Sequence, residues 1–141
     1  MIVLDASALI DVLLGQPYAL DVLAEQAVGH EQEPLHAPEL IEPETLSALR
    51  QLVMRGQLDG ARADEAVLGL GAIRCIRYPH APFRERVWEL RHNLTPYDAL
   101  YLALAEALGD ATLLTGDSGL AAQAAQTIGP ERVRHLRADQ A

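Results

Sequence analysis

The sequence contains no lysine, one cysteine and few aromatic residues. Without lysine the chain has no side-chain amine for Schiff-base chemistry, and its 11 permanent positive side chains are all arginine. The single cysteine, Cys75, cannot form an internal disulfide and is typical of a reducing compartment. Aromatic residues make up 4% of the chain. We therefore expect an aliphatic core, which suits helices packed on a sheet better than a β-sandwich.

Positive charge is also scarce, because 20 acidic residues face 11 basic ones and the net charge is −9. This balance argues against a nucleic-acid partner, which usually meets a basic surface. The objection weakens if several acids share a metal site, where bound cations reverse the local charge. The N-terminal stretch carries Asp5 and Asp11 and no basic residue, unlike a signal peptide or membrane span. We expect a cytoplasmic protein without a membrane partner.

Short apolar runs alternate with helical patterns along the whole chain, without repeats or a linker. The expected strands cover residues 2–4, 35–37, 73–77, 112–115 and 132–135. The expected helices cover residues 8–14, 18–28, 42–55, 61–70, 82–91, 96–107 and 118–125. Ser7 and Thr95 are the expected caps of the first and sixth helices. The pattern predicts one α/β domain over residues 1–141, with a central parallel sheet of about four to five strands flanked by helices on both faces.

Four acidic residues occupy equivalent places in this scheme. Asp5 ends the first strand, Asp117 follows the fourth strand, and Glu44 and Asp98 lie in the first turns of helices. In an open α/β sheet these places share one edge, so the carboxylates can converge. Converging carboxylates repel one another unless a cation lies between them. Hard divalent ions such as Mg²⁺ or Mn²⁺ prefer oxygen ligands and could activate water for phosphodiester cleavage.

Each of these acids also has a purely structural interpretation. Asp98 could complete a capping box with Thr95, Asp117 could cap the helix that follows it, and Glu44 could complement a helix dipole. Asp5 is harder to explain structurally, because it interrupts an apolar run at a strand end. Two further acids, Asp11 and Asp21, are expected on solvated helix faces.

Four segments resemble, in order, the motifs of the PIN-domain family, and more narrowly of VapC-type toxins from toxin–antitoxin pairs. They are IVLDASALIDVL, HAPELIEPETLSALRQLV, LTPYDALYLALAEALG and TLLTGDSGLAAQA, and they cover residues 2 to about 125. The resemblance implies a single PIN-like domain and a metal-dependent endoribonuclease that acts as a toxin. It also implies an RNA substrate, a VapB-type antitoxin partner, and a homodimer that forms a heterotetramer or larger assembly with the antitoxin.

The resemblance assigns roles to individual positions. The acidic cluster that binds Mg²⁺ (or Mn²⁺) and carries catalysis matches Asp5, Glu44, Asp98 and Asp117. The hydroxyls that support such acids match Ser7 and Thr115. Glu42 could share or replace the role of Glu44, although the spacing to the Ala-Leu-Arg that follows favours Glu44.

RNA contact is assigned only weakly, to Arg50, Arg84 and Arg86, since most arginines are simply solvated. A zinc site is not expected, because the histidines lack ligand spacing. A receiver domain needs a lysine, and phosphatases of the Asp-x-Asp type need a second aspartate where Ser7 stands. The remaining alternative is a non-catalytic PIN-fold module that binds RNA or protein, and the presence of all four acids argues against it.

Overall fold

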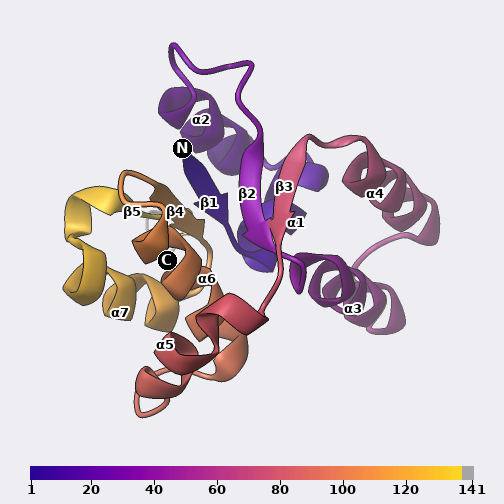
Figure 1. Cartoon of the computed structure of the whole chain (residues 1–141). Coiled ribbons are helices and arrows are strands. Elements are labelled where there is room, and N and C mark those ends of the chain that lie inside the picture. The colour runs from indigo at the N-terminus through magenta and orange to yellow at the C-terminus, as the bar shows by residue number, and fades with distance from the viewer. Residues whose placement is uncertain (138–141) are drawn as a thin grey trace.

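Five short parallel strands form the centre of the protein. In the computed structural model, which describes residues 1–137, they pair in the order β3-β2-β1-β4-β5 (Figure 1). Their bounds are β1 (Ile2–Leu4), β2 (Leu35–Pro38), β3 (Cys75–Tyr78), β4 (Thr112–Thr115) and β5 (Val133–His135). All neighbouring pairs are parallel, and Val3 of β1 is in register with His36 on one side and Leu113 on the other. The predicted α/β class and parallel sheet are confirmed.

Seven α-helices lie within the described residues and cover both faces of the sheet. They are α1 (Ala6–Leu13), α2 (Pro17–Gln26), α3 (Ile41–Met54), α4 (Gly60–Ala72), α5 (Arg84–Glu89), α6 (Pro96–Ala107) and α7 (Ser118–Ile128). The chain adds β2 and β3 on one side of β1, then returns to add β4 and β5 on the other. Right-handed crossovers in these two directions place helices on opposite faces. Accordingly, α1 packs with α2, α3 and α4, whereas α6 packs with α5 and α7.

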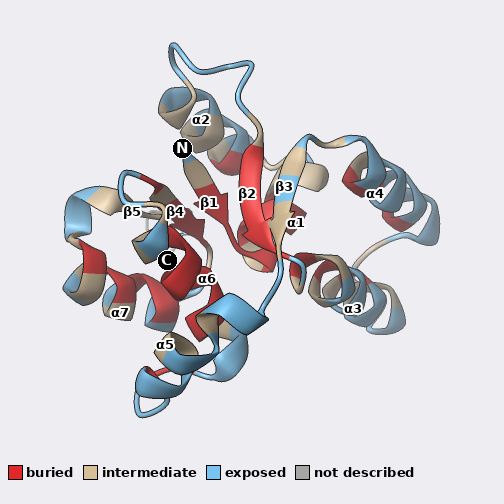
Figure 2. Cartoon of the chain, viewed as in Figure 1, coloured by how far each residue is buried: buried red, intermediate tan, exposed pale blue. Residues whose placement is uncertain are grey.

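Burial is greatest along the middle strands and in α6. Val3, Leu4, Leu113 and Leu114 are fully buried in β1 and β4. Figure 2 shows β2 and much of α6 as buried, whereas α4 is largely exposed. Helix α6 is buried at every position from Ala99 to Ala105, because it lies across the sheet between α5 and α7. A helix that is apolar on all sides belongs in a core, so α6 is a rigid support for the residues at its start.

Two local predictions were wrong. The first helix begins at Ala6, and its cap is Asp5 rather than Ser7, because the Asp5 side chain accepts the amide of Ala8. The segment 82–91 is not one helix: a 3₁₀ turn at Ala81–Phe83 precedes α5, which ends at Glu89. By length and composition, no single helix of the described part could cross a membrane; α1 and α2 pass that test only together, with a bend of 110° between them.

Candidate active site

The strand order creates a switch point between β1 and β4. From β1 the chain continues to β2 on one side, whereas β4 continues to β5 on the other. Open α/β sheets bind ligands at such a point, outside the carboxyl ends of the strands. Asp5 comes directly after β1, and its backbone amide donates to the carbonyl of Leu114 in β4 at 3.2 Å. Asp5 therefore lies at the place where the topology favours a ligand.

The Asp5 carboxylate is buried, with 4% of the residue exposed, and both of its oxygens are held by donors. Oδ1 accepts the Ser7 hydroxyl at 2.6 Å and the Ala8 amide at 2.9 Å, and Oδ2 accepts the Thr115 hydroxyl at 2.5 Å. Burial raises the pKa of Asp5 above its usual value, although these donors oppose the rise. The structure thus gives Ser7 and Thr115 direct contact with the acid.

The four predicted acids line one cavity of about 340 Å³ at this edge of the sheet. Glu44 lies in the first turn of α3, and Asp98 lies in the first turn of α6, where its amide donates to the Thr95 hydroxyl. Asp117 caps α7 through a 2.7 Å hydrogen bond from the Leu120 amide to Oδ1. The capping interpretations are therefore correct for Thr95 and Asp117, and they are compatible with a place in the cavity.

Glu44, not Glu42, belongs to the cavity. Its Oε1 accepts the Tyr101 hydroxyl at 2.9 Å, and Tyr101 is fully buried in α6. Glu42 instead forms an ion pair with Arg77 of β3. Tyr101 was not predicted from the sequence, although its position one helical turn after Asp98 places both side chains on the same face of α6.

The pKa values of Asp98 and Glu44 are raised in the cavity, first by burial and then by neighbouring carboxylates. Burial first, and then the charges of Asp117 and Asp5, raise the pKa of Asp98 to about 6. The pKa of Glu44 is also raised, by burial and by the charges of Asp5 and Asp98, and the Tyr101 hydroxyl opposes this shift. Burial and the neighbouring Glu44 raise the pKa of Tyr101 as well. A cation in the cavity would relieve the repulsion.

The donor chemistry suits a hard divalent ion. All four acids offer carboxylate oxygens, which Mg²⁺ and Mn²⁺ prefer. Within residues 1–137, however, no three His, Cys, Asp or Glu side chains lie close enough together to hold a metal ion as they stand. Mg²⁺ commonly takes only one or two carboxylates directly and keeps several of its waters. The cavity therefore fits an ion that binds some of these carboxylates and completes its coordination shell with water molecules.

The three arginines predicted to contact RNA do not line the cavity. Arg50 is exposed on α3, and Arg84 lines a separate hollow with Trp88. Arg86 is paired with Glu89 and Glu106. The prediction that they bind RNA stays a prediction.

A different arginine lies at the cavity, and it was not predicted from the sequence. Arg137 lines the cavity and donates Nε and Nη2 to the two oxygens of Asp11, each at 2.9 Å. Asp11 is only 5% exposed, so the prediction that it lies on a solvated helix face was wrong. Asp21 is exposed as predicted. One feature of the sequence could have indicated Arg137. It follows the end of the last strand at the same spacing as Asp117 follows the end of the fourth strand, Thr115.

An acidic cavity at the switch point of a parallel sheet defines the class of this chain: an α/β protein with a carboxylate-lined cavity at the carboxyl ends of its strands. Residues 2–126 match the family model described as PIN domain. The chain belongs to the PIN-domain family.

Known relatives cover most of the chain. It is 44% identical to "Ribonuclease VapC1" of Mycobacterium tuberculosis over 122 residues, which cover 85% of this chain and 88% of the relative. It is 42% identical to "Ribonuclease VapC9" of the same organism, with 83% and 86% covered. The crystal structure of PAE2754 from Pyrobaculum aerophilum superposes with a TM-score of 0.59 at 27% identity, covering 86% of this chain and 82% of that one.

Proposed function

We propose that this chain is a metal-dependent endoribonuclease and the toxin of a toxin–antitoxin pair. The observation that carries the proposal is the cavity at the switch point, where Asp5, Glu44, Asp98 and Asp117 converge with raised pKa values for three of them. Relatives named as VapC ribonucleases support the same activity. Phosphodiester cleavage needs concentrated positive charge, and a cavity of oxygen ligands is a way to hold that charge as metal ions.

The four acids would hold Mg²⁺ (or Mn²⁺), which when bound lowers the pKa of water and stabilises charge on the phosphate and leaving oxygen. Asp5 is oriented for this role by Ser7 and Thr115, and Glu44 is oriented by Tyr101. Because all of these contacts restrict rotation, the ligands are preorganised.

Asp98 is the better candidate for a proton acceptor. Both Asp5 oxygens already accept hydrogen bonds, whereas the Asp98 carboxylate forms none within residues 1–137. The pKa of Asp98, about 6, also lies near the pH at which a general base works well. Asp98 could therefore take a proton from the attacking water.

As a toxin, the chain would be held inactive by a VapB-type antitoxin. The net charge of −9 is compatible with a basic antitoxin segment that covers the acidic cavity. The expected assembly is a homodimer that joins antitoxin chains in a heterotetramer or larger complex. We place this activity in the cytoplasm, a compartment that suits the free thiol of Cys75.

The competing candidate is a non-catalytic PIN-fold module that binds RNA or protein. One assay distinguishes the nuclease from the non-catalytic module. Purified chain, freed of copurified antitoxin, is incubated with structured and unstructured RNAs in Mg²⁺, in Mn²⁺ and in EDTA, beside Asp5→Asn and Asp98→Asn. The nuclease requires cleavage that depends on metal and disappears in both variants. RNA binding without cleavage in any metal would favour the non-catalytic module.

A further inference from the structure

We propose that Arg137, positioned by Asp11, binds a phosphate of the RNA at the rim of the acidic cavity. This inference rests on the proposed function and adds a substrate contact to it. The four acids can hold cations, but they repel the polyanion that has to approach them. A fixed donor of positive charge beside the acids would anchor the RNA backbone next to the bond to be cut.

Arg137 lies directly beside the hydrogen-bond network of Asp5. A Cβ atom built on Gly116 would be 3.0 Å from Arg137 Nε and 3.1 Å from Ser7 Oγ. That Ser7 hydroxyl accepts the Gly116 amide and donates to Asp5. The Arg137 side chain and the Ser7 hydroxyl that binds Asp5 therefore both lie close to Gly116. A larger residue at 116 would crowd both side chains.

The contact with Asp11 fixes the direction of the guanidinium. Asp11 engages Nε and Nη2 as a fork, and Nη1 takes no part in that contact. The Arg137 side chain is 45% exposed, whereas that of Asp11 is 7% exposed. One edge of the guanidinium thus faces a buried carboxylate and Tyr18 lies close to it, whereas the exposed part of the side chain is open to a ligand from solvent. Such a planar fork is well suited to phosphate oxygens.

Asp11 also keeps Arg137 away from the acids. An unrestrained arginine next to Asp5, Asp98 and Asp117 would pair with them and compete with metal ions. The buried Asp11 carboxylate lies on α1, outside the set of four, and holds the guanidinium in a two-point contact. Asp11 is therefore a positioning residue, and Arg137 is the residue that contacts substrate.

Other arginines near the sheet either form ion pairs away from the cavity or line the cavity without an ion pair to fix them. Arg77 pairs with Glu42, and Arg134 pairs with Glu25, and neither arginine lines the cavity. Arg55 lines the cavity from the end of α3, but no carboxylate within residues 1–137 fixes it. Arg137 combines both properties, a place at the cavity and a fixed orientation.

The simpler alternative is that the Arg137–Asp11 ion pair only holds the segment after β5 against α1 and stabilises the fold. In that case folded protein without the ion pair would bind RNA with unchanged affinity, whereas loss of a phosphate contact would lower the affinity. The variants are Arg137→Gln, Arg137→Lys and Asp11→Asn, and the matched control is Arg134→Gln, which removes another arginine of the same C-terminal segment. Thermal melting first identifies the temperature range in which each variant is folded.

The decisive measurement is the salt dependence of RNA affinity. Each chain carries Asp98→Asn as a common background so that a labelled single-stranded RNA stays intact, and affinity is measured by fluorescence anisotropy over a range of salt concentrations. Loss of one phosphate contact in Arg137→Gln should lower affinity about tenfold and reduce the slope of log affinity against log salt by about 0.7. Arg137→Lys should recover the slope but only part of the affinity. Arg134→Gln should match the parent.

Cleavage kinetics without the background variant give the second readout. A phosphate contact made before and during reaction predicts that Arg137→Gln raises KM about tenfold with a smaller change in kcat. Asp11→Asn should raise KM less, because the arginine remains but is free to turn toward the acids. Unchanged affinity, salt slope and KM in folded Arg137→Gln would overturn the inference and leave the ribonuclease standing. A parent chain that neither binds nor cuts RNA would overturn the proposed function, and the phosphate contact with it.

Discussion

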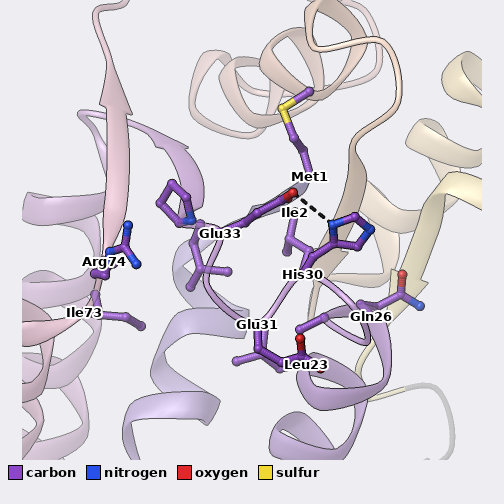
Figure 3. A pocket seen from close by; sticks show the side chains of 12 residues that line it. Met1, Ile2, Leu23, Gln26, His30, Glu31, Glu33, Ile73 and Arg74 are labelled. Carbon is purple, nitrogen blue, oxygen red and sulfur yellow. Dashed lines mark hydrogen bonds and ion pairs between the residues drawn. The ribbon is translucent and has the colours of Figure 1, made fainter.

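The two edges of the sheet differ in how their acidic residues are paired. At the amino ends of the strands, a hollow of about 250 Å³ is lined by residues that include Met1, His30, Glu31, Glu33 and Arg74 (Figure 3). Its acids are satisfied locally: Glu33 pairs with His30 at 2.9 Å, and Glu31 accepts the Gly29 amide at 3.1 Å. At the carboxyl ends, Asp5, Glu44 and Asp117 also accept hydrogen bonds, but all four acids line one cavity, and none of them forms an ion pair within residues 1–137.

The pKa values of acids at the two edges shift in opposite directions. Backbone amides of Glu31 itself and of Gly29 lower the pKa of Glu31 below its ordinary value. Burial and neighbouring carboxylates raise the pKa of Asp98 to about 6. Both groups are ordinary carboxylic acids, so only their surroundings decide the direction. An edge that gathers buried carboxylates at a cost in stability is the edge at which a ligand is expected.

The largest expected effect is that of Asp5→Asn, which removes the buried charge at the switch point. RNA cleavage in Mg²⁺ should fall roughly a hundredfold or more, because a metal ligand is lost. Glu33→Gln at the opposite edge is the matched control and should cleave at the parental rate. Initial rates on one RNA substrate compare the two variants. Similar losses in both would remove the distinction between the edges.

Thr115→Val should have the next largest effect. It keeps the shape of a fully buried side chain and removes the hydroxyl that donates to Asp5 and accepts the Asp117 amide. The free energy of unfolding should fall by about 1–2 kcal/mol, because a buried carboxylate oxygen loses its donor. Cleavage should fall about tenfold, the lower range for a residue that orients a metal ligand. Denaturant unfolding and initial rates check the two values, and a parental cleavage rate would argue that Asp5 needs no orientation.

Asp98→Asn should stabilise the metal-free protein at neutral pH. Because the folded-state pKa of Asp98 is raised to about 6 from 3.8, ionisation on going from pH 4 to pH 7 disfavours the folded state. The amide side chain of the variant carries no such charge, so the variant should be more stable in EDTA at pH 7 by about 1–2 kcal/mol after allowance for solvent screening. The difference should shrink as the pH falls from 6 toward 4. Melting curves across this range test the sign.

Glu31→Gln should have the smallest effect, and the sign should be opposite. A lowered pKa stabilises the folded state above the ordinary value near 4.5, and this contribution disappears as the pH falls. Because Glu31 is fully exposed, we expect a slightly lower melting temperature at pH 7 and no difference in acid. Cleavage should be unchanged. A gain in stability at pH 7 would mean that the two edges do not differ as described.

Much of the architecture could be predicted from local patterns. Apolar runs such as Ile2–Leu4 and Thr112–Thr115 became strands with the predicted bounds, and Thr95 and Pro96 marked the start of α6 correctly. These signals are local, since they depend on apolar spacing and on capping chemistry. Boundaries were less exact at the first helix. The sequence analysis assigned its cap to Ser7, whereas Asp5, in an extended conformation, caps it by accepting the Ala8 amide.

Contacts between distant segments could not be predicted in the same way. No local pattern joins Asp11 with Arg137, or Tyr101 with Glu44, because nothing local restricts how far apart such partners lie in the chain. The choice between Glu42 and Glu44 also depended on a distant residue, Arg77, which pairs with Glu42.

The sequence by itself determined the alternation of strands and helices, and it placed four acids at strand ends and helix starts, where parallel strands bring ligands. Those positions follow from short-range chemistry that is complete within a few residues. Only the tertiary structure decided which carboxylates share a cavity, which are paired elsewhere, and which arginine lies beside them. Such choices depend on burial and on charges from remote parts of the chain, and these exist only once the strands have paired and the helices have packed.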